Sequence, residues 1–296
     1  MSLAPFPLEA DVLAYIRDVF EIANMRVTAN LDRMPTTHEQ ALDFAFIGAL
    51  SEAHGPHMTT SGVLVDVDAH FVGGGWHWER WEIADIGLII AFRRGEALLR
   101  TKVVLLQSKR LYPRESEFVE DQGVARAGGF GSLMIPSLPA TLGLRNFRFD
   151  ESCCYKALQV GDNQWRAIAG YEAKYAIPVH YMLYHPGVLP YECRIPVKLP
   201  VAAGNEKPVV GVRVVPGRVL RSRVGNASRN YAPAYRELAN DGVLGWALPD
   251  FIVDEVLTCR EGYIADDAEN EGLNVVFYQR NAPIAAAIRI AITVPE

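Results

Sequence analysis

Apolar residues recur with helical spacing in three stretches of the chain. At residues 8–28 they return every three or four positions, which predicts an amphipathic helix. A second helix is predicted to begin just after Thr36 or Thr37, because either hydroxyl can cap it and Glu39 then falls in its first turn. Residues 164–175 show the same spacing and predict a third helix.

Other stretches have the pattern of β-strands. Residues 63–72 alternate between apolar and polar side chains, and residues 86–92 and 102–111 are short, continuous apolar runs. We expect these three to form a meander of strands beside the second helix. The apolar runs at 177–184 and 282–294 predict buried strands.

Together these elements predict an α/β fold with a central mixed β-sheet flanked by helices. The order helix, three strands, helix and strand places the core of the fold in residues 36–185. Residues 1–35 are expected to form an N-terminal helical segment. Residues 186–296 are expected to form a C-terminal α+β extension packed on the core, and residues 186–235 within it are expected to form strands and loops over the active face.

The charge of the chain is unevenly distributed. The net charge of -6 argues against a protein that coats nucleic acid with its whole surface. Residues 93–114, however, hold seven arginines and lysines against one glutamate, and residues 194–229 hold eight against one. Residues 237–271 reverse the sign, with ten carboxylates against one arginine. These runs predict either a basic groove for nucleic acid or ordinary solvated faces, and charge alone does not choose between the two.

The cysteines and the N-terminus bear on the compartment. Cys153, Cys154, Cys193 and Cys259 have neither the paired spacing of a zinc site nor the density of a disulfide scaffold. The first residues lack the basic and apolar regions of a signal peptide, and no apolar run is long enough to span a bilayer. We therefore expect a cytoplasmic protein that does not use a membrane.

Polar residues with potential chemistry interrupt two of the apolar strands. Gln107 and Lys109 lie two positions apart near the end of one strand, so their side chains share a face. Asp85 begins the preceding strand, which should bring its carboxylate close to them. Hydrolysis of a phosphodiester needs oxygen ligands for a hard cation and a cationic group beside the phosphate. Asp85, Gln107 and the main-chain carbonyl of Ser108 can supply the first, and Lys109 the second.

The sequence Ala-Asp-Ile-Gly at residues 84–87, followed by Leu-Leu-Gln-Ser-Lys-Arg at residues 105–110, resembles the PD-(D/E)XK nuclease superfamily. More specifically, it is similar to the Gln-x-Lys variant of some restriction and phage-defence endonucleases. The resemblance covers residues 36–185 and implies a restriction endonuclease-like core. Ala84 stands where the superfamily has proline, and Gln107 stands where an acid is more usual.

The resemblance implies a metal-dependent nuclease that hydrolyses DNA with Mg²⁺ or Mn²⁺ in restriction or antiviral defence, as a homodimer or with other subunits of a defence system. It implies that Glu39 matches a catalytic helix glutamate, and that Gln164 loosely matches a glutamine of a later helix. Because Gln107 carries no charge, Glu39 or Glu82 is expected to complete the metal ligands. The basic runs add candidate nucleic-acid contacts, namely Arg110, Arg114, Arg218, Arg221 and Arg223.

Two alternatives stay open. Asp85, Gln107 and Lys109 would also suit a buried salt bridge with an amide neighbour, and Glu39 would suit an ordinary helix start. The chain would then be a catalytically inactive nuclease-fold protein that acts as a nucleic-acid-binding or assembly module.

Overall fold

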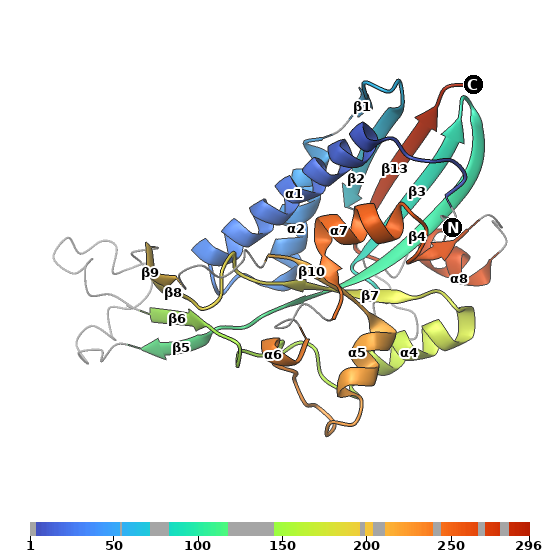
Figure 1. The fold of residues 1–296 in the computed structure, drawn as a ribbon. Helices are drawn as coiled ribbons and strands as arrows, with labels where there is room; N and C mark the ends of the chain where they lie inside the picture. Colours follow the sequence, from blue (N-terminus) through green and yellow to red (C-terminus); the bar gives the residue numbers. More distant parts are fainter. Residues whose placement is uncertain are drawn as a thin grey trace.

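The strands of the protein form two sheets (Figure 1). The computed structural model describes residues 4–53, 55–71, 83–117, 145–195, 199–203, 211–238, 244–265, 270–278 and 284–296. Within these ranges the larger sheet has nine strands: β1 (Gly55–Met58), β2 (Leu64–Phe71), β3 (Ile86–Arg94), β4 (Ala97–Arg110), β7 (Val179–Tyr184), β10 (Arg213–Pro216), β11 (Trp246–Ala247), β12 (Tyr263–Ile264) and β13 (Ala286–Val294). The smaller sheet has four: β5 (Arg114–Glu117), β6 (Arg145–Phe149), β8 (Tyr191–Ile195) and β9 (Leu199–Ala203).

The order of the large sheet is β1-β2-β13-β3-β4-β7-β10-β11, with β12 paired to β4. The expected meander of three adjacent strands is wrong, because β13 lies between β2 and β3, antiparallel to the first and parallel to the second. Both faces of β3 are largely buried and β13 is strongly apolar, so the last strand of the chain satisfies the open edge of β3. Residues 186–296 therefore contribute strands to the sheet itself.

The candidate site lies where β4 runs between β3 and β7. β3 and β4 pair antiparallel, with Ile86 opposite Leu106. β4 and β7 pair parallel, with Gln107 opposite Tyr181 and Lys109 opposite Leu183. Between these parallel strands the chain forms helix α4 (Asn163–Tyr175), so the predicted unit of a helix followed by a strand that returns to the sheet is confirmed.

Two antiparallel helices, α1 (Ala10–Arg33) and α2 (Glu39–Ser51), pack against each other, and α2 contacts β2 and β4 (Figure 1). The prediction of Thr36 or Thr37 as the N-cap is wrong. His38 occupies that position and makes no side-chain capping bond. The turn before α2 is stabilised by another group, since the Arg110 guanidinium donates to the main-chain carbonyls of Pro35 and Thr37.

The region after β7 holds short elements that the sequence did not predict individually. They include helix α5 (Gly217–Val224), which follows β10 directly, and a π-helical segment, η2 (Phe251–Val256). The others are α6 (Tyr235–Leu238), α7 (Leu248–Asp250), α8 (Glu271–Leu273) and the π-helical segment η3 (Asn274–Tyr278).

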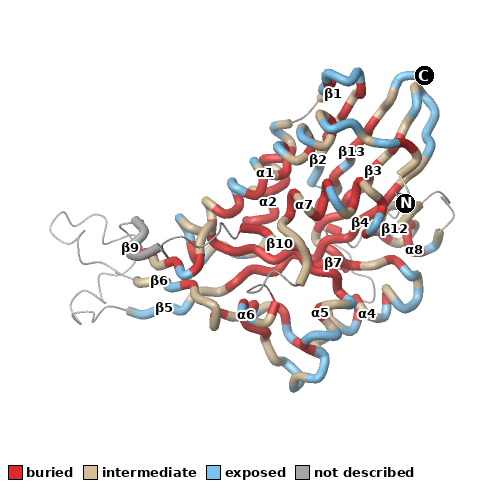
Figure 2. Tube along the Cα trace, in the orientation of Figure 1, coloured by how far each residue is buried: buried red, intermediate tan, exposed pale blue. Residues whose placement is uncertain are grey.

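Buried residues follow the large sheet and the inner faces of α1 and α2, as Figure 2 shows. The small sheet projects to one side of this core, and β5 continues the path of β4 after a short connection (Figure 1). The candidate site therefore lies close to the junction of the two sheets. None of the described helices combines the length and apolar character that crossing a bilayer requires.

Candidate active site

The Asp85 carboxylate contacts the middle of the Gln107 to Lys109 segment, as the sequence predicted. Asp85 immediately precedes β3, and its main-chain N–H donates to the carbonyl of Leu106 at 2.9 Å. Its Oδ2 accepts hydrogen bonds from the main-chain N–H of Ser108, at 2.6 Å, and from Nε2 of Gln107. Two donors on β4 thus fix the half-buried carboxylate at the edge of its strand.

Gln107 has one end of its amide engaged and the other end open. The residue is 1% exposed, and its Oε1 has no hydrogen-bond partner among the described residues. An unsatisfied buried acceptor of this kind costs about 1–3 kcal/mol. The oxygen stands on the same amide that donates to Asp85, so an oxygen ligand for a cation is available beside a carboxylate.

Lys109 reaches toward helix α2. Its Nζ lies 3.8 Å from Oε2 of Glu39, and the two side chains are 6% and 20% exposed. The other oxygen of Glu39 accepts from the main-chain N–H of Arg110 at 3.0 Å. The Glu39 carboxylate therefore holds both the side chain and the backbone at the end of β4. The contact of Asp85 with Gln107 and the contact of Lys109 with Glu39 form two halves of the site, joined by consecutive residues of one strand.

Asp43 is a further residue of the site, and reasoning from the sequence missed it. It lies one helical turn after Glu39 on α2 and is 3% exposed. Its Oδ1 accepts from the Ser108 hydroxyl at 2.6 Å and from the Tyr184 hydroxyl at 2.5 Å. Burial raises the pKa of Asp43 to about 6, although the two hydroxyl donors lower it. The four-residue spacing from Glu39 was a usable signal, because it places both acids on one face of the helix.

The Arg110 guanidinium is an internal structural group, and its proposed role as a nucleic-acid contact is corrected. The residue is 1% exposed, and its guanidinium donates to the carbonyl of Pro35 at 2.6 Å and to that of Thr37. The run of alternating residues places it on the face of β4 that α2 covers. It links the strand to the turn between α1 and α2.

The other basic candidates are spread over different elements. Arg114 of β5 is 61% exposed and lies 3.2 Å from Asp150. On α5, Arg218 is 2.6 Å from Glu261, Arg221 pairs with Glu172, and Arg223 is exposed.

Carboxylates from outside the basic run therefore neutralise two of the three α5 arginines, and local counting of charges did not anticipate this pairing. Gln164 is half-buried in the first turn of α4, while Glu82 lies outside the described residues.

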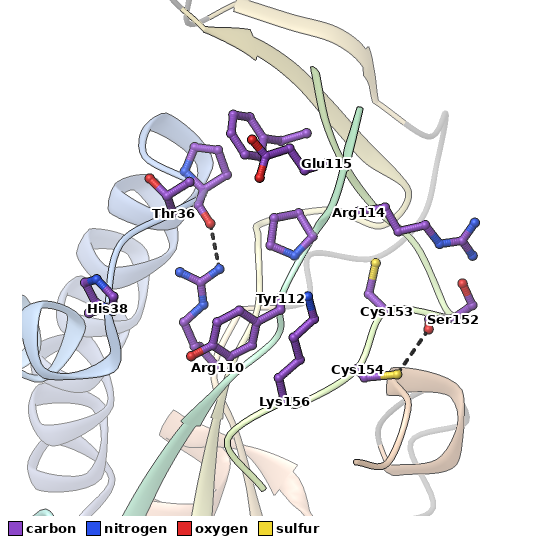
Figure 3. Close-up of a pocket in the computed structure, with 13 residues that line it drawn as sticks. Thr36, His38, Arg110, Tyr112, Arg114, Glu115, Ser152, Cys153, Cys154 and Lys156 are labelled. Atoms are coloured by element: carbon purple, nitrogen blue, oxygen red, sulfur yellow. Dashed lines mark hydrogen bonds between the residues drawn. The ribbon is translucent and has the colours of Figure 1, made fainter. Parts of the chain in front are cut away.

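A cavity of about 660 Å³ opens beyond the end of β4 (Figure 3). Its wall includes Arg110, Tyr112 and Arg114 from the chain that leads from β4 into β5. Cys153 and Lys156, which follow β6, also line it. Glu39 accepts a hydrogen bond from the main-chain N–H of Arg110, which lines the cavity, so the cavity adjoins the half of the site that Glu39 holds.

The described residues contain no cluster of three or more His, Cys, Asp or Glu side chains suited to a metal ion. A cation at Asp85 would therefore depend on the Gln107 amide, on main-chain oxygen and on water. No protein-family model, curated protein or solved structure matches the chain. Function is therefore inferred from the residues and their geometry.

Proposed function

We propose that the protein is a metal-dependent nuclease that hydrolyses phosphodiester bonds of DNA. The observation that carries the proposal is the open Oε1 of buried Gln107 on the amide that donates to Asp85. Most buried acceptors in folded proteins have a partner, which can be a protein group, a water or an ion, so the open Oε1 is a place where a cation would be bound. An oxygen-binding cation would remove this deficit.

Asp85, the Gln107 Oε1 and the main-chain carbonyl of Ser108 would hold the cation. These donors are all oxygens, which suits Mg²⁺ or Mn²⁺. Mg²⁺ keeps several waters and is commonly held by only one or two carboxylates, so the lack of a three-acid cluster among the described residues is compatible with it. The bound ion would supply polarisation of the phosphate and a more acidic coordinated water.

Lys109 is the group proposed to stabilise negative charge on the phosphate. Its ammonium is almost buried, so its electrostatic effect is stronger than it would be in bulk water. Glu39 positions it from α2 and also fixes the Arg110 backbone. Asp43 acts on the other side of the same strand segment, because it holds the Ser108 hydroxyl. These contacts preorganise the end of β4.

A second candidate is an inactive nuclease-like module that binds nucleic acid or assembles with a partner. One observation favours it: Oδ2 of Asp85 already accepts two hydrogen bonds from the protein. Because these hydrogen bonds already stabilise the carboxylate, a metal ion would add less stabilisation there.

Cleavage of supercoiled plasmid in Mg²⁺, Mn²⁺ or EDTA tests the proposal. We expect nicked and linear products with either metal and none in EDTA, and we expect Lys109→Ala to remove them. DNA that stays supercoiled under all three conditions but is bound in a gel-shift assay would favour the inactive module. A role in antiviral defence, with other subunits or as a homodimer, rests on the family resemblance and is proposed only with the nuclease activity.

A further inference from the structure

The cavity beyond β4 has an unusual combination of cationic and apolar lining. Arg110, Arg114 and Lys156 line it, while Glu115 is the one carboxylate among the described lining residues. Burial raises the pKa of the Cys153 thiol, so this part of the wall is neutral at physiological pH. Among the described lining residues the cations therefore outnumber the carboxylates, although Arg114 also lies 3.2 Å from Asp150, which does not line the cavity.

Tyr112 lies at the centre of this cationic lining. The Arg110 guanidinium carbon lies 4.2 Å from the centroid of the Tyr112 ring, and the Lys156 ammonium lies 5.7 Å from it. Figure 3 shows the ring between these two side chains. Both distances fall within the range of cation–π attraction, which holds the two positive groups along one wall. Lys156 and Arg114 are both exposed.

The Arg110 guanidinium is only partly satisfied by hydrogen bonds. Its Nε has no hydrogen-bond partner among the described residues, although the residue is 1% exposed and two of its other nitrogens are satisfied. An acceptor or a negative charge placed nearby stabilises a buried guanidinium that has a donor without a hydrogen-bond partner.

The size and the lining of the cavity select the ligand. A volume of about 660 Å³ exceeds what an inorganic phosphate needs and suits a small organic molecule. Pro35, Pro113 and Phe147 provide apolar wall for a flat ring, and the cations suit a phosphate. A nucleotide combines both features.

We propose that this cavity binds a nucleotide through its phosphate, with Arg114 and Lys156 as the contacting cations and Arg110 as the buried positive wall. The inference rests on the proposed nuclease function for its meaning: the cavity lies beyond the end of the strand that carries Lys109, and the bound nucleotide would flank the phosphodiester cleaved there. Its binding chemistry is independent of the metal site, so the two ideas fail separately.

Binding is measured in EDTA, where no cleavage occurs, with a fluorescein-labelled 5′-phosphorylated single-stranded 12-mer and the full chain. Arg114→Gln/Lys156→Gln is compared with Arg260→Gln/Arg166→Gln. The control pair also removes two exposed cations, one of which pairs with a carboxylate, and neither lines the cavity. We expect the cavity variant to bind at least about tenfold more weakly, with a salt slope shallower by about 0.7 for each phosphate interaction removed, and the control to bind like the parent.

Thr36→Trp separates a cavity from a diffuse basic surface. Thr36 is exposed at the cavity wall, so a tryptophan there should fill space without changing charge or core packing. We expect it to weaken binding as well.

Competition with deoxyadenosine monophosphate shows which form of nucleotide the cavity binds. Displacement of the labelled strand means that it binds a free nucleotide, and no displacement means that it binds a nucleotide only within a strand. Either result supports the proposal. Unchanged affinity in the cavity variant, or an effect of the charge variant without any effect of Thr36→Trp, would overturn it. If the cavity proposal fails in this way but the parent protein still cleaves DNA, the nuclease proposal stands. If binding is tight and depends on the cavity but no DNA is cleaved, the cavity proposal stands and the nuclease proposal fails.

Discussion

The hydroxyl of Ser108 donates to the buried carboxylate of Asp43 at 2.6 Å, across the contact between α2 and β4. Ser108 also donates its main-chain N–H to Asp85 on the neighbouring strand. One residue thus connects the metal-binding half of the proposed site to the helix that carries Glu39. The relationship makes the position of β4 depend on a carboxylate with a raised pKa, and it leads to the first prediction.

Asp43→Asn should change how stability depends on pH. The pKa of Asp43 is raised from 3.8 to about 6, so between these values the folded state binds more protons than the unfolded state. Stability therefore falls as pH rises through this window, and the loss is complete above about pH 6. Asparagine cannot ionise but still offers an oxygen to Ser108 and Tyr184. We expect urea unfolding at pH 4, 5, 6 and 7.5 to show a smaller loss with pH for the variant than for the parent.

Two controls belong with this measurement. Burial also raises the pKa of Asp32 to about 6, so Asp32→Asn should remove a separate part of the same dependence. Asp18 is exposed on α1, and Asp18→Asn is the matched substitution at the surface. Equal pH dependence in Asp43→Asn and in the parent would show that Asp43 is not titrating in this range.

Lys109→Ala should lower the rate of DNA cleavage by about 10²–10³-fold, which is the usual effect of removing one preorganised electrostatic donor. We expect the melting temperature to stay close to that of the parent, because Glu39 keeps its hydrogen bond from the Arg110 backbone. Lys174→Ala is the control for loss of an exposed lysine–glutamate pair, since Lys174 lies 3.7 Å from Glu271 at the surface. A variant at Lys109 that cleaves at the parental rate would remove this residue from the mechanism.

The local elements of the fold were predictable from sequence, while their pairing was not. Apolar periodicity within short stretches of sequence predicts helices α1, α2 and α4 and strands β3, β4 and β7. The position of β13 depends on pairing Ala286 with Ile86, 200 positions apart, and local periodicity contains no information on such a partner. Helix α5 was missed because its eight residues include three arginines and offer only a short apolar repeat.

The candidate site shows the same division. Strand alternation was enough to predict that Gln107 lies near Asp85. The role of Arg110 could not be predicted, because burial of a guanidinium against the carbonyls of Pro35 and Thr37 depends on the turn before α2. Pairing of Arg218 with Glu261 and of Arg221 with Glu172 likewise joins residues 43 and 49 positions apart.

Gln107→Glu tests the metal directly. In EDTA the new carboxylate would lie beside Asp85, and two neighbouring negative charges should lower the melting temperature. Mg²⁺ should then raise it by several degrees more than it raises that of the parent, because the variant gains an anionic ligand. Scanning calorimetry measures this difference in EDTA and in Mg²⁺ or Ca²⁺. A metal concentration of about 5 mM is chosen to saturate a weak site. If the metal changes the melting temperature of neither protein, the proposed cation site is excluded.

Replacement of the three α5 arginines by glutamine should separate structural from nucleic-acid contacts. Arg221 pairs with Glu172, whose other oxygen accepts from the Val179 N–H at 2.8 Å, so Arg221→Gln should destabilise the fold by about 1–3 kcal/mol. Arg223 is exposed, and Arg223→Gln should leave stability unchanged.

If α5 contacts the DNA backbone, the triple variant that also carries Arg218→Gln should show a salt slope of log affinity shallower by about 0.9 for each phosphate interaction removed. Base preference should not change, since phosphate contacts position the duplex without reading its sequence, and cleavage at saturating DNA should survive. Fluorescence anisotropy at four salt concentrations measures the slope, and urea unfolding of each single variant identifies any weakening that arises from stability. An unchanged slope would mean that Arg218 and Arg221 serve only in their ion pairs with Glu261 and Glu172. DNA would then contact another part of the protein, and the first candidates are Arg114 and the β3 residues Arg93 and Arg94.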